Sequence, residues 1–191
     1  MICDTHLVHW AADTATSLLA PLGDRWLHIQ GVVERACWVG KVFHEDDRSC
    51  LIAAAYMHDI GYAPALKKTG FHPLDGANYL QSLGYDRLAS LVAHHSEARF
   101  EASLRGFEAA LEAFPRERSA VADALTYCDL TTGTTGEPLT LKERAADIYS
   151  RYGDRDVVTQ SLRQSMPFVS LAVARTSRRL YRCELIKRTR R

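Results

Sequence analysis

Apolar side chains recur about every three to four residues along most of the chain, which is the spacing of one face of an α-helix. The pattern starts at Asp24, which can cap a helix whose inward stripe holds His28, Val32, Ala36 and Val39. Further helices are predicted over residues 48–59, 73–83, 86–95, 102–113, 120–130, 140–151 and 154–186. No segment alternates apolar and polar residues as a half-buried strand would, so we expect an all-α fold.

Several helix boundaries are marked by residues with strong positional preferences. Ser119 can cap one helix, and Pro73 suits the first helical position of another, which leaves His72 at its cap. The segment TTGTTGEP at 131–138 has the composition of a loop. Pro167 should divide the last predicted helix in two, because proline removes a backbone hydrogen bond and clashes with the preceding turn.

The stretch LIAAAYMHDIGYAP, residues 51–64, places an imidazole and a carboxylate at the end of a helix that is apolar on every side. Such a helix is typical of the buried centre of a domain. Burying His58 or Asp59 is costly unless a partner compensates the polar group. A metal ion would compensate both, so the other ligands should lie elsewhere in the chain.

Further candidate ligands occupy helix ends or inward helix positions, where groups from different helices can converge. They are His28, His72, the pair His94-His95, and Asp129, which falls in line with Val121 and Leu125. Metals such as Mn, Fe and Zn accept this mixture of imidazole and carboxylate ligands at about 2.0–2.3 Å. A lone histidine on an apolar face is usually a hydrogen-bonded core residue, but the whole set favours a metal site.

Taken in chain order, His28, His58-Asp59 and Asp129 resemble the H…HD…D signature of the HD-domain superfamily, whose members are helical, metal-dependent phosphohydrolases. The segments HDIG, FHPLDGANYL and LVAHHS resemble its dinuclear branch, which includes the HD-GYP cyclic dinucleotide phosphodiesterases and the YqeK-type dinucleotide hydrolases. The resemblance covers roughly residues 24–135. The context LTYCDLTTG is similar to that of a small bacterial subgroup, whereas EARFEA follows HHS where HD-GYP proteins have their G-Y-P segment.

The resemblance implies a centre with two divalent ions, Fe or Mn, with Zn, Mg, Ni and Co as alternatives. The implied ligands are His28, His58, Asp59 and Asp129 for the first ion, and a bridging Asp59 with His72 and His94 for the second. Helical phase instead puts His95 on the inward face, so His94 is preferred from the resemblance and His95 is kept beside it. The expected catalytic groups are His58, Asp59 and His95.

Cations that could bind a substrate phosphate are less clearly marked. In many family members a lysine follows HDIG and meets the phosphate, but this chain has Tyr62 there. Lys67 and Lys68 follow a few residues later and could replace it, and Arg25 and Arg99 are further candidates. For each of these cations, solvation at the surface is an equally good explanation.

The expected reaction is hydrolysis of a phosphate ester or anhydride of a nucleotide-like substrate through a metal-bridging hydroxide, since paired ions make hydroxide available near neutral pH. Two alternatives stay open. One is a di-iron oxygenase of the HD fold, and the other is a non-catalytic regulatory protein that binds metal.

Composition narrows the remaining classes. The 191 residues carry a net charge of +1 and are 47% hydrophobic, which fits one domain over 1–191 with an HD core at 24–135 and C-terminal helices at 140–186. The charge gives no reason to expect nucleic acid or a membrane as partner; a small phosphorylated substrate is expected, and a homo-oligomer is left open. Scattered cysteines favour a reducing compartment, and the chain shows no leader or spanning segment, so the expected location is the cytoplasm.

Overall fold

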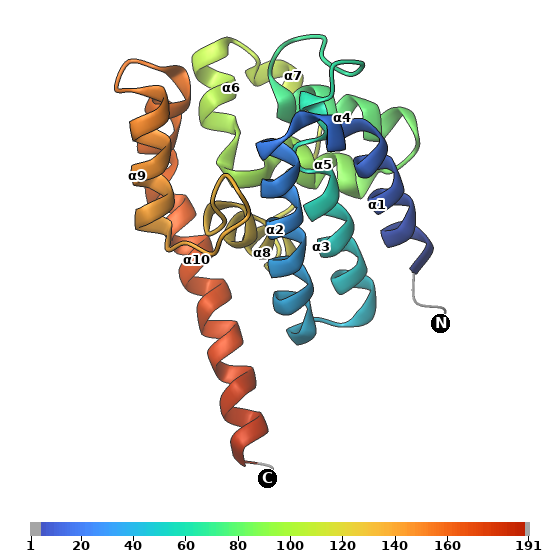
Figure 1. Ribbon diagram of the computed structural model, residues 1–191, viewed down its shortest axis with the longest axis vertical. Helices are drawn as coiled ribbons and strands as arrows, with labels where there is room; N and C mark the ends of the chain where they lie inside the picture. The colour runs from blue at the N-terminus through green and yellow to red at the C-terminus, as the bar shows by residue number, and fades with distance from the viewer. Residues whose placement is uncertain (1–4, 190–191) are drawn as a thin grey trace.

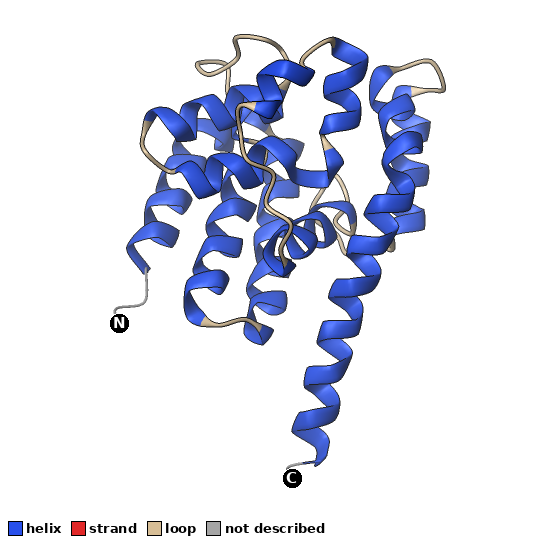
Figure 2. Ribbon diagram, turned by 180° about the vertical axis from the view of Figure 1, so that it is seen from behind, coloured by secondary structure: helices blue, strands red, loops and turns tan. Residues whose placement is uncertain are grey.

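The computed structural model describes residues 5–189, and within that range the chain is built from ten α-helices joined by loops and short 3-10 turns (Figure 2). The helices are α1 Thr5–Leu19, α2 Asp24–Val39, α3 Glu45–Met57, α4 His72–Ser82, α5 Asp86–His94, α6 Arg99–Arg105, α7 Glu108–Glu112, α8 Ala120–Leu130, α9 Leu141–Tyr152 and α10 Val157–Thr189. Over residues 5–189 the extended pairing is limited to an isolated bridge between Thr132 and Pro138. The expectation of an all-α fold is therefore confirmed.

Helix α3 lies at the centre of the fold, in contact with α1, α2, α5 and α8 (Figure 1). Every residue from Ser49 to Ala55 is buried, as predicted for a helix that is apolar on all sides. A second, smaller group of buried apolar residues joins α9 and α10 to the end of α8. The end of α10 extends beyond the other helices in both ribbon views (Figures 1 and 2). In the part of the chain that the structure describes, no helix is long and apolar enough to cross a membrane.

The predicted continuous helix at 102–113 is wrong, because the chain forms two shorter helices there, α6 and α7. Gly106 ends α6 with a φ of 76°, a left-handed conformation that glycine adopts without strain. The turn directs Phe107 inward, where its ring stacks on Phe71 with centroids 5.7 Å apart. Packing of this aromatic pair accompanies the break in the helical pattern.

The predicted break at Pro167 is also wrong, since α10 runs through it. Pro167 is exposed, so the carbonyl of Arg163, which loses its helical donor, faces water rather than the core. Leu162 and Val169 are buried on either side of the proline and hold both halves of α10 against the fold.

Of two predicted helix starts, one is confirmed and the other lies one residue earlier than expected. The hydroxyl of Ser119 accepts hydrogen bonds from the backbone N–H groups of Val121 and Ala122, both at 3.2 Å, and so caps α8. Helix α4 begins at His72 rather than at Pro73, with Phe71 as its cap. The first residue of α4 therefore carries a side chain of chemical interest.

Candidate metal centre

Five structural elements converge on one group of imidazoles and carboxylates. His28 comes from α2, His58 and Asp59 from the end of α3, and Asp129 from the end of α8. His72 opens α4, and His95 opens the 3-10 turn η4, His95–Glu97, which follows α5. Their polar atoms fall into two sets whose members lie within 4.8 Å of one another, His28-His58-Asp129 and Asp59-His72-His95.

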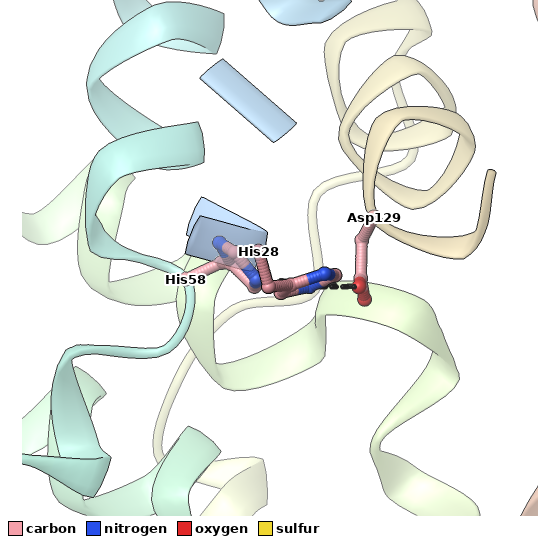
Figure 3. Close-up of side chains that lie close together, drawn as sticks. All are labelled: His28, His58 and Asp129. Atoms are coloured by element: carbon pink, nitrogen blue, oxygen red, sulfur yellow. Dashed lines mark hydrogen bonds and ion pairs between the residues drawn. The ribbon is translucent and has the colours of Figure 1, made fainter. Parts of the chain in front are cut away.

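The first set is buried between α2, α3 and α8 (Figure 3). His28 Nε2 lies 3.2 Å from Asp129 Oδ1, and His58 Nε2 lies 4.0 Å from the same oxygen. Figure 3 shows both rings directed toward that carboxylate. Nε2 of His58 has no hydrogen-bond partner among the described residues, although it is buried. A buried imidazole nitrogen left in this state is a natural metal ligand.

The second set adjoins the first through Asp59. Oδ2 of Asp59 lies 3.5 Å from His58 Nε2, whereas Oδ1 lies 3.2 Å from His72 Nε2. His72 Nε2 is in turn 3.3 Å from His95 Nε2. Asp59 therefore presents one oxygen to each set, which is the arrangement that a carboxylate needs to bridge two ions.

Backbone carbonyls orient three of the imidazoles. Nδ1 of His28 lies 2.9 Å from Gly133 O, Nδ1 of His58 lies 2.8 Å from Ala55 O, and Nδ1 of His95 lies 2.6 Å from Val92 O. A carbonyl only accepts hydrogen bonds, so each Nδ1 donates to it and Nε2 is the nitrogen that each ring turns toward the site. Three Nε2 atoms therefore face the site, and such contacts at Nδ1 are typical of metal-ligating histidines.

The charge state of the site is favourable for a cation. Burial lowers the pKa of His58 and lowers that of His95 to about 4, which keeps both rings neutral near pH 7. Burial alone would raise the pKa of Asp59, but Arg25 and the neighbouring imidazoles outweigh it and hold the pKa well below its usual range. Burial also opposes ionisation of Asp129, yet the hydrogen bond from His28 and the nearby imidazoles lower its pKa. Ionised carboxylates beside the neutral imidazoles of His58 and His95 fit a divalent metal.

A glycine contact brings α4 close enough for His72 to reach Asp59. Gly61 follows HDI, and a Cβ atom built there would lie 2.1 Å from the carbonyl oxygen of His72 and 2.7 Å from the backbone nitrogen of Gly76. No side chain fits at this position. The glycine of HDIG and the glycine of FHPLDGANYL are therefore packing requirements of the second ligand set.

A second glycine contact positions His28. A Cβ atom on Gly31 would lie 2.4 Å from the carbonyl oxygen of Gly136, so the loop 131–138 can approach α2 only where both residues lack side chains. Gly136 also has a φ of 89°, which glycine tolerates best. The close approach places the carbonyl of Gly133 within hydrogen-bonding distance of His28 Nδ1.

His94 does not lie with the other candidate ligands. Its Nε2 lies 2.8 Å from the carbonyl oxygen of Phe114, which directs the ring away from both sets. His95 takes its place beside His72. The preference for His94 drawn from the resemblance therefore disagrees with this geometry, whereas the helical phase of Leu88, Leu91 and Val92 indicated His95.

The two sets open into a cavity of about 260 Å³. We call it the histidine pocket, and His28, Asp59, His72, His95 and Asp129 contribute to its lining. Arg25 also lines it: its guanidinium donates to Asp59 Oδ2 at 2.6 Å and lies 4.0 Å from the centroid of the Tyr62 ring. That ring stacks in turn on His72 at 4.1 Å. The cation beside the HDIG segment is therefore supplied by α2.

The other three expected phosphate-binding residues lie outside the histidine pocket. Lys67 and Lys68 are exposed on a loop whose backbone N–H groups donate to the buried carboxylate of Asp75. Arg99 pairs with Glu97 at 2.9 Å and faces a different hollow. The proximity of Lys67 and Lys68 to HDIG in the sequence did not bring their side chains into the pocket.

The histidine pocket also contains two arginines of α9 that were not predicted from the sequence, Arg144 and Arg151. Asp147 binds both, at 2.9 Å from Arg144 Nη1 and 2.9 Å from Arg151 Nη2. Arg144 is buried, and its Nε has no partner among the described residues. Their spacing in the sequence would have predicted that Arg144, Asp147 and Arg151, at i, i+3 and i+7, lie on one face of a helix.

Comparison with family models identifies the class of the protein. The model of the HD domain matches residues 25–151, which is more than half of the chain, and the chain therefore belongs to the HD-domain family. Members of this family are typically metal-dependent phosphohydrolases that bind divalent ions. Searches of curated proteins and of solved structures gave no match.

Proposed function

We propose that the protein hydrolyses a phosphate ester or anhydride of a nucleotide-like substrate at a centre of two divalent ions, Fe or Mn. The observation that carries the proposal is the position of Asp59, whose two oxygens face the two sets of imidazoles at 3.5 and 3.2 Å. A single structural ion would need only one of these sets.

The donor set supports two neighbouring sites. His28, His58 and Asp129 would hold one ion, His72 and His95 would hold the other, and Asp59 would bridge them. When bound, such ions act as Lewis acids and make water acidic enough to supply hydroxide near neutral pH. Carboxylate and imidazole ligands of this kind suit Mn, Fe and Zn alike, so the choice of Fe or Mn is part of the proposal.

The arginines of the histidine pocket would bind the phosphate. Arg25 lies against Asp59, whereas Arg144 and Arg151 line the same pocket from helix α9. Guanidinium groups match the geometry of phosphate oxygens and stay charged when buried. Arg144 Nε, which is buried and has no hydrogen-bond partner within residues 5–189, is available for such a contact.

Tyr62 has a positioning role in this scheme. Its ring lies between Arg25 and His72, in contact with both. Burial, with the nearby charge of Asp59 adding to it, raises the pKa of its hydroxyl, so the ring stays neutral. Tyr62 therefore holds a cation and a ligand in place, where many family members have a lysine.

The experiment that tests the reaction class separates hydrolysis from oxygenation. The protein would be loaded with Mn and assayed under strict anaerobiosis for phosphate or nucleoside monophosphate release from a panel of nucleotides and dinucleotides. Hydrolysis needs no change of metal valence and no dioxygen, so we expect turnover under these conditions. Turnover that requires both iron and dioxygen across the panel would replace the hydrolase with the oxygenase.

A further inference from the structure

A second hollow, of about 870 Å³, lies on the other side of η4 from the histidine pocket. We call it the arginine groove, after the residues of its lining that share a guanidinium group: Arg99, Arg116, Arg118, Arg175 and Arg179. It is bordered by the end of α5, residues 116–126 and the middle of α10. The proposed reaction uses none of these arginines.

The arginine groove has an excess of positive charge. Its five arginines face three carboxylates, those of Glu97, Glu117 and Asp123. Glu117 is already paired with Arg87, which lies outside the lining, at 2.9 Å. Arg118 is exposed and makes no ion pair within residues 5–189. The amino terminus of α8 also opens onto the groove at Ser119 and Ala120, and its dipole favours an anion.

Polar and apolar features of the lining fit a phosphorylated ligand of moderate size. Thr176 is 3% exposed, and its Oγ1 has no hydrogen-bond partner among the described residues, so it can donate to a ligand oxygen. Phe168 and Leu171 remain 44% and 48% exposed at the same surface, with Arg99 stacked 4.6 Å from the Phe168 ring centroid. The groove thus offers cations for phosphates beside an apolar face.

The segment that separates the two hollows is bonded to both sides. Ser96 and Glu97 of η4 have φ values of 49° and 60°, in the left-handed region that residues with side chains rarely adopt. The Ser96 hydroxyl donates to Asp129 on the metal side. Glu97 accepts from Arg99 at 2.9 Å and from Arg116 on the groove side. Opposed hydrogen bonds therefore hold an unfavourable backbone conformation next to a candidate ligand.

We propose that the arginine groove binds a polyphosphate anion and that this binding regulates the neighbouring centre through Glu97. Phosphate oxygens that engage Arg99 and Arg116 compete directly with the Glu97 carboxylate. Releasing Glu97 removes one of the two restraints on η4, so the Ser96–Asp129 contact and the position of His95 change with it. The regulatory half of the inference rests on the proposed function; the binding half does not.

Binding is tested by calorimetric titration of the metal-loaded protein with a non-hydrolysable imido analogue of ATP. Divalent metal is kept in excess over the nucleotide, so that chelation cannot strip the centre. Imidodiphosphate and adenosine are titrated in parallel. We expect the two phosphate-bearing probes to bind and adenosine to give no signal; binding by the nucleotide analogue but not by imidodiphosphate would show that the base, rather than the phosphates, is recognised and would overturn the assignment.

Two matched pairs of substitutions locate the site. The double variant Arg118→Ala with Arg179→Ala removes two exposed cations of the groove, and Arg178→Ala with Arg182→Ala removes two exposed cations of α10 that lie outside it. We expect the first pair to weaken binding about tenfold or more, since hydrogen bonds to charged groups are the strong ones, and the second pair to have little effect. Equal weakening in both variants would mean non-specific charge attraction and would overturn the site.

Glu97→Gln provides a test with the opposite sign. Glutamine keeps the size of the side chain but no longer holds the two arginines as a carboxylate does, so probe binding should tighten several-fold. Unchanged or weaker binding in a folded Glu97→Gln protein would remove Glu97 as the competitor. Hydrogen exchange at the backbone amides of residues 94–98 should rise on probe binding to the wild-type protein; unchanged exchange would sink the coupling. Neither readout depends on turnover, so failure of the hydrolase proposal would be seen separately in the phosphate-release assay.

Discussion

The two ligand sets are held with different firmness. His28, His58 and Asp129 are all buried, and both imidazoles of this set are fixed by a hydrogen bond to a backbone carbonyl. In the other set, His72 has a side chain that is 16% exposed, and among the described residues no hydrogen bond holds its Nδ1. Its ring is positioned by stacking on Tyr62 instead.

This difference predicts two unequal metal sites. A ligand whose orientation is fixed before binding loses less freedom when the ion arrives, so the first set should bind more tightly. The second set lines the histidine pocket more openly, and no backbone carbonyl orients the His72 ring among the described residues, so its ion should exchange more readily. In the proposed centre, one ion would therefore be retained and the other would exchange more readily, with Asp59 between the two sites.

The largest expected effect comes from Asp129→Asn. The substitution keeps the shape of the side chain but removes the negative charge from the His28-His58-Asp129 set. We expect kcat to fall at least about 100-fold, because even outer partners of metal ligands are worth about 10–100-fold. Metal content should fall while helix content, measured by circular dichroism, is unchanged. Asp13→Asn is the control, since Asp13 is exposed on α1 and lines neither the histidine pocket nor the arginine groove. Normal turnover in the Asp129→Asn protein would exclude this carboxylate from the centre.

His72→Ala should affect metal content more selectively. We expect about two equivalents of Fe or Mn in the well-loaded protein and about one in the variant, because only the Asp59-His72-His95 set loses a ligand. His28→Ala, which removes a ligand from the His28-His58-Asp129 set, is the comparison and should lose metal more completely. Elemental analysis of protein purified without chelator measures both. Full retention of two ions by the His72→Ala protein would contradict the two-site arrangement.

Much of the fold and of the site could be predicted from sequence because each candidate ligand stands at a helix end or on an inward helix face. His28 shares the stripe of Val32 and Ala36, and Asp129 shares that of Val121 and Leu125, so local periodicity was enough. The choice between His94 and His95 was harder, since α5 ends at His94 and the next residue has extended backbone, with ψ of 147° at His95. The helical pattern pointed to His95, and the family pattern pointed to His94.

The pocket arginines depend on packing between distant segments, which the sequence does not reveal. Arg144 reaches the histidine pocket only because α9 packs on α8 and α10, after the loop 131–138 has turned back onto α2. Conversely, the closeness of Lys67 to HDIG along the chain was misleading, because Asp75 ties that loop down by its backbone. The expectation that residues 1–191 form one domain stays a prediction.

Arg144→Ala should have a moderate effect that lies mainly in KM. The guanidinium contacts Asp147 and Thr134, not the candidate ligands, so its loss weakens phosphate binding without opening either metal set. We expect KM to rise about tenfold, the worth of one hydrogen bond to a charged group, and kcat to fall less. Arg163→Ala, an exposed residue of α10 paired with Asp154, is the control and should change neither constant. Unchanged KM in the Arg144→Ala protein would remove α9 from substrate binding.

The smallest effect is expected for the removal of Lys67 and Lys68 together. The family pattern would make these lysines substitutes for the missing cation after HDIG, so their loss would raise KM. Both lysines are exposed and neither lines the histidine pocket, and charges at the surface are screened beyond about 10 Å at ordinary salt. We therefore expect KM and kcat to change less than about twofold, as is usual for surface substitutions. A rise in KM as large as that of Arg144→Ala would mean that the loop at 63–71 closes over the substrate and forms part of the substrate-binding pocket.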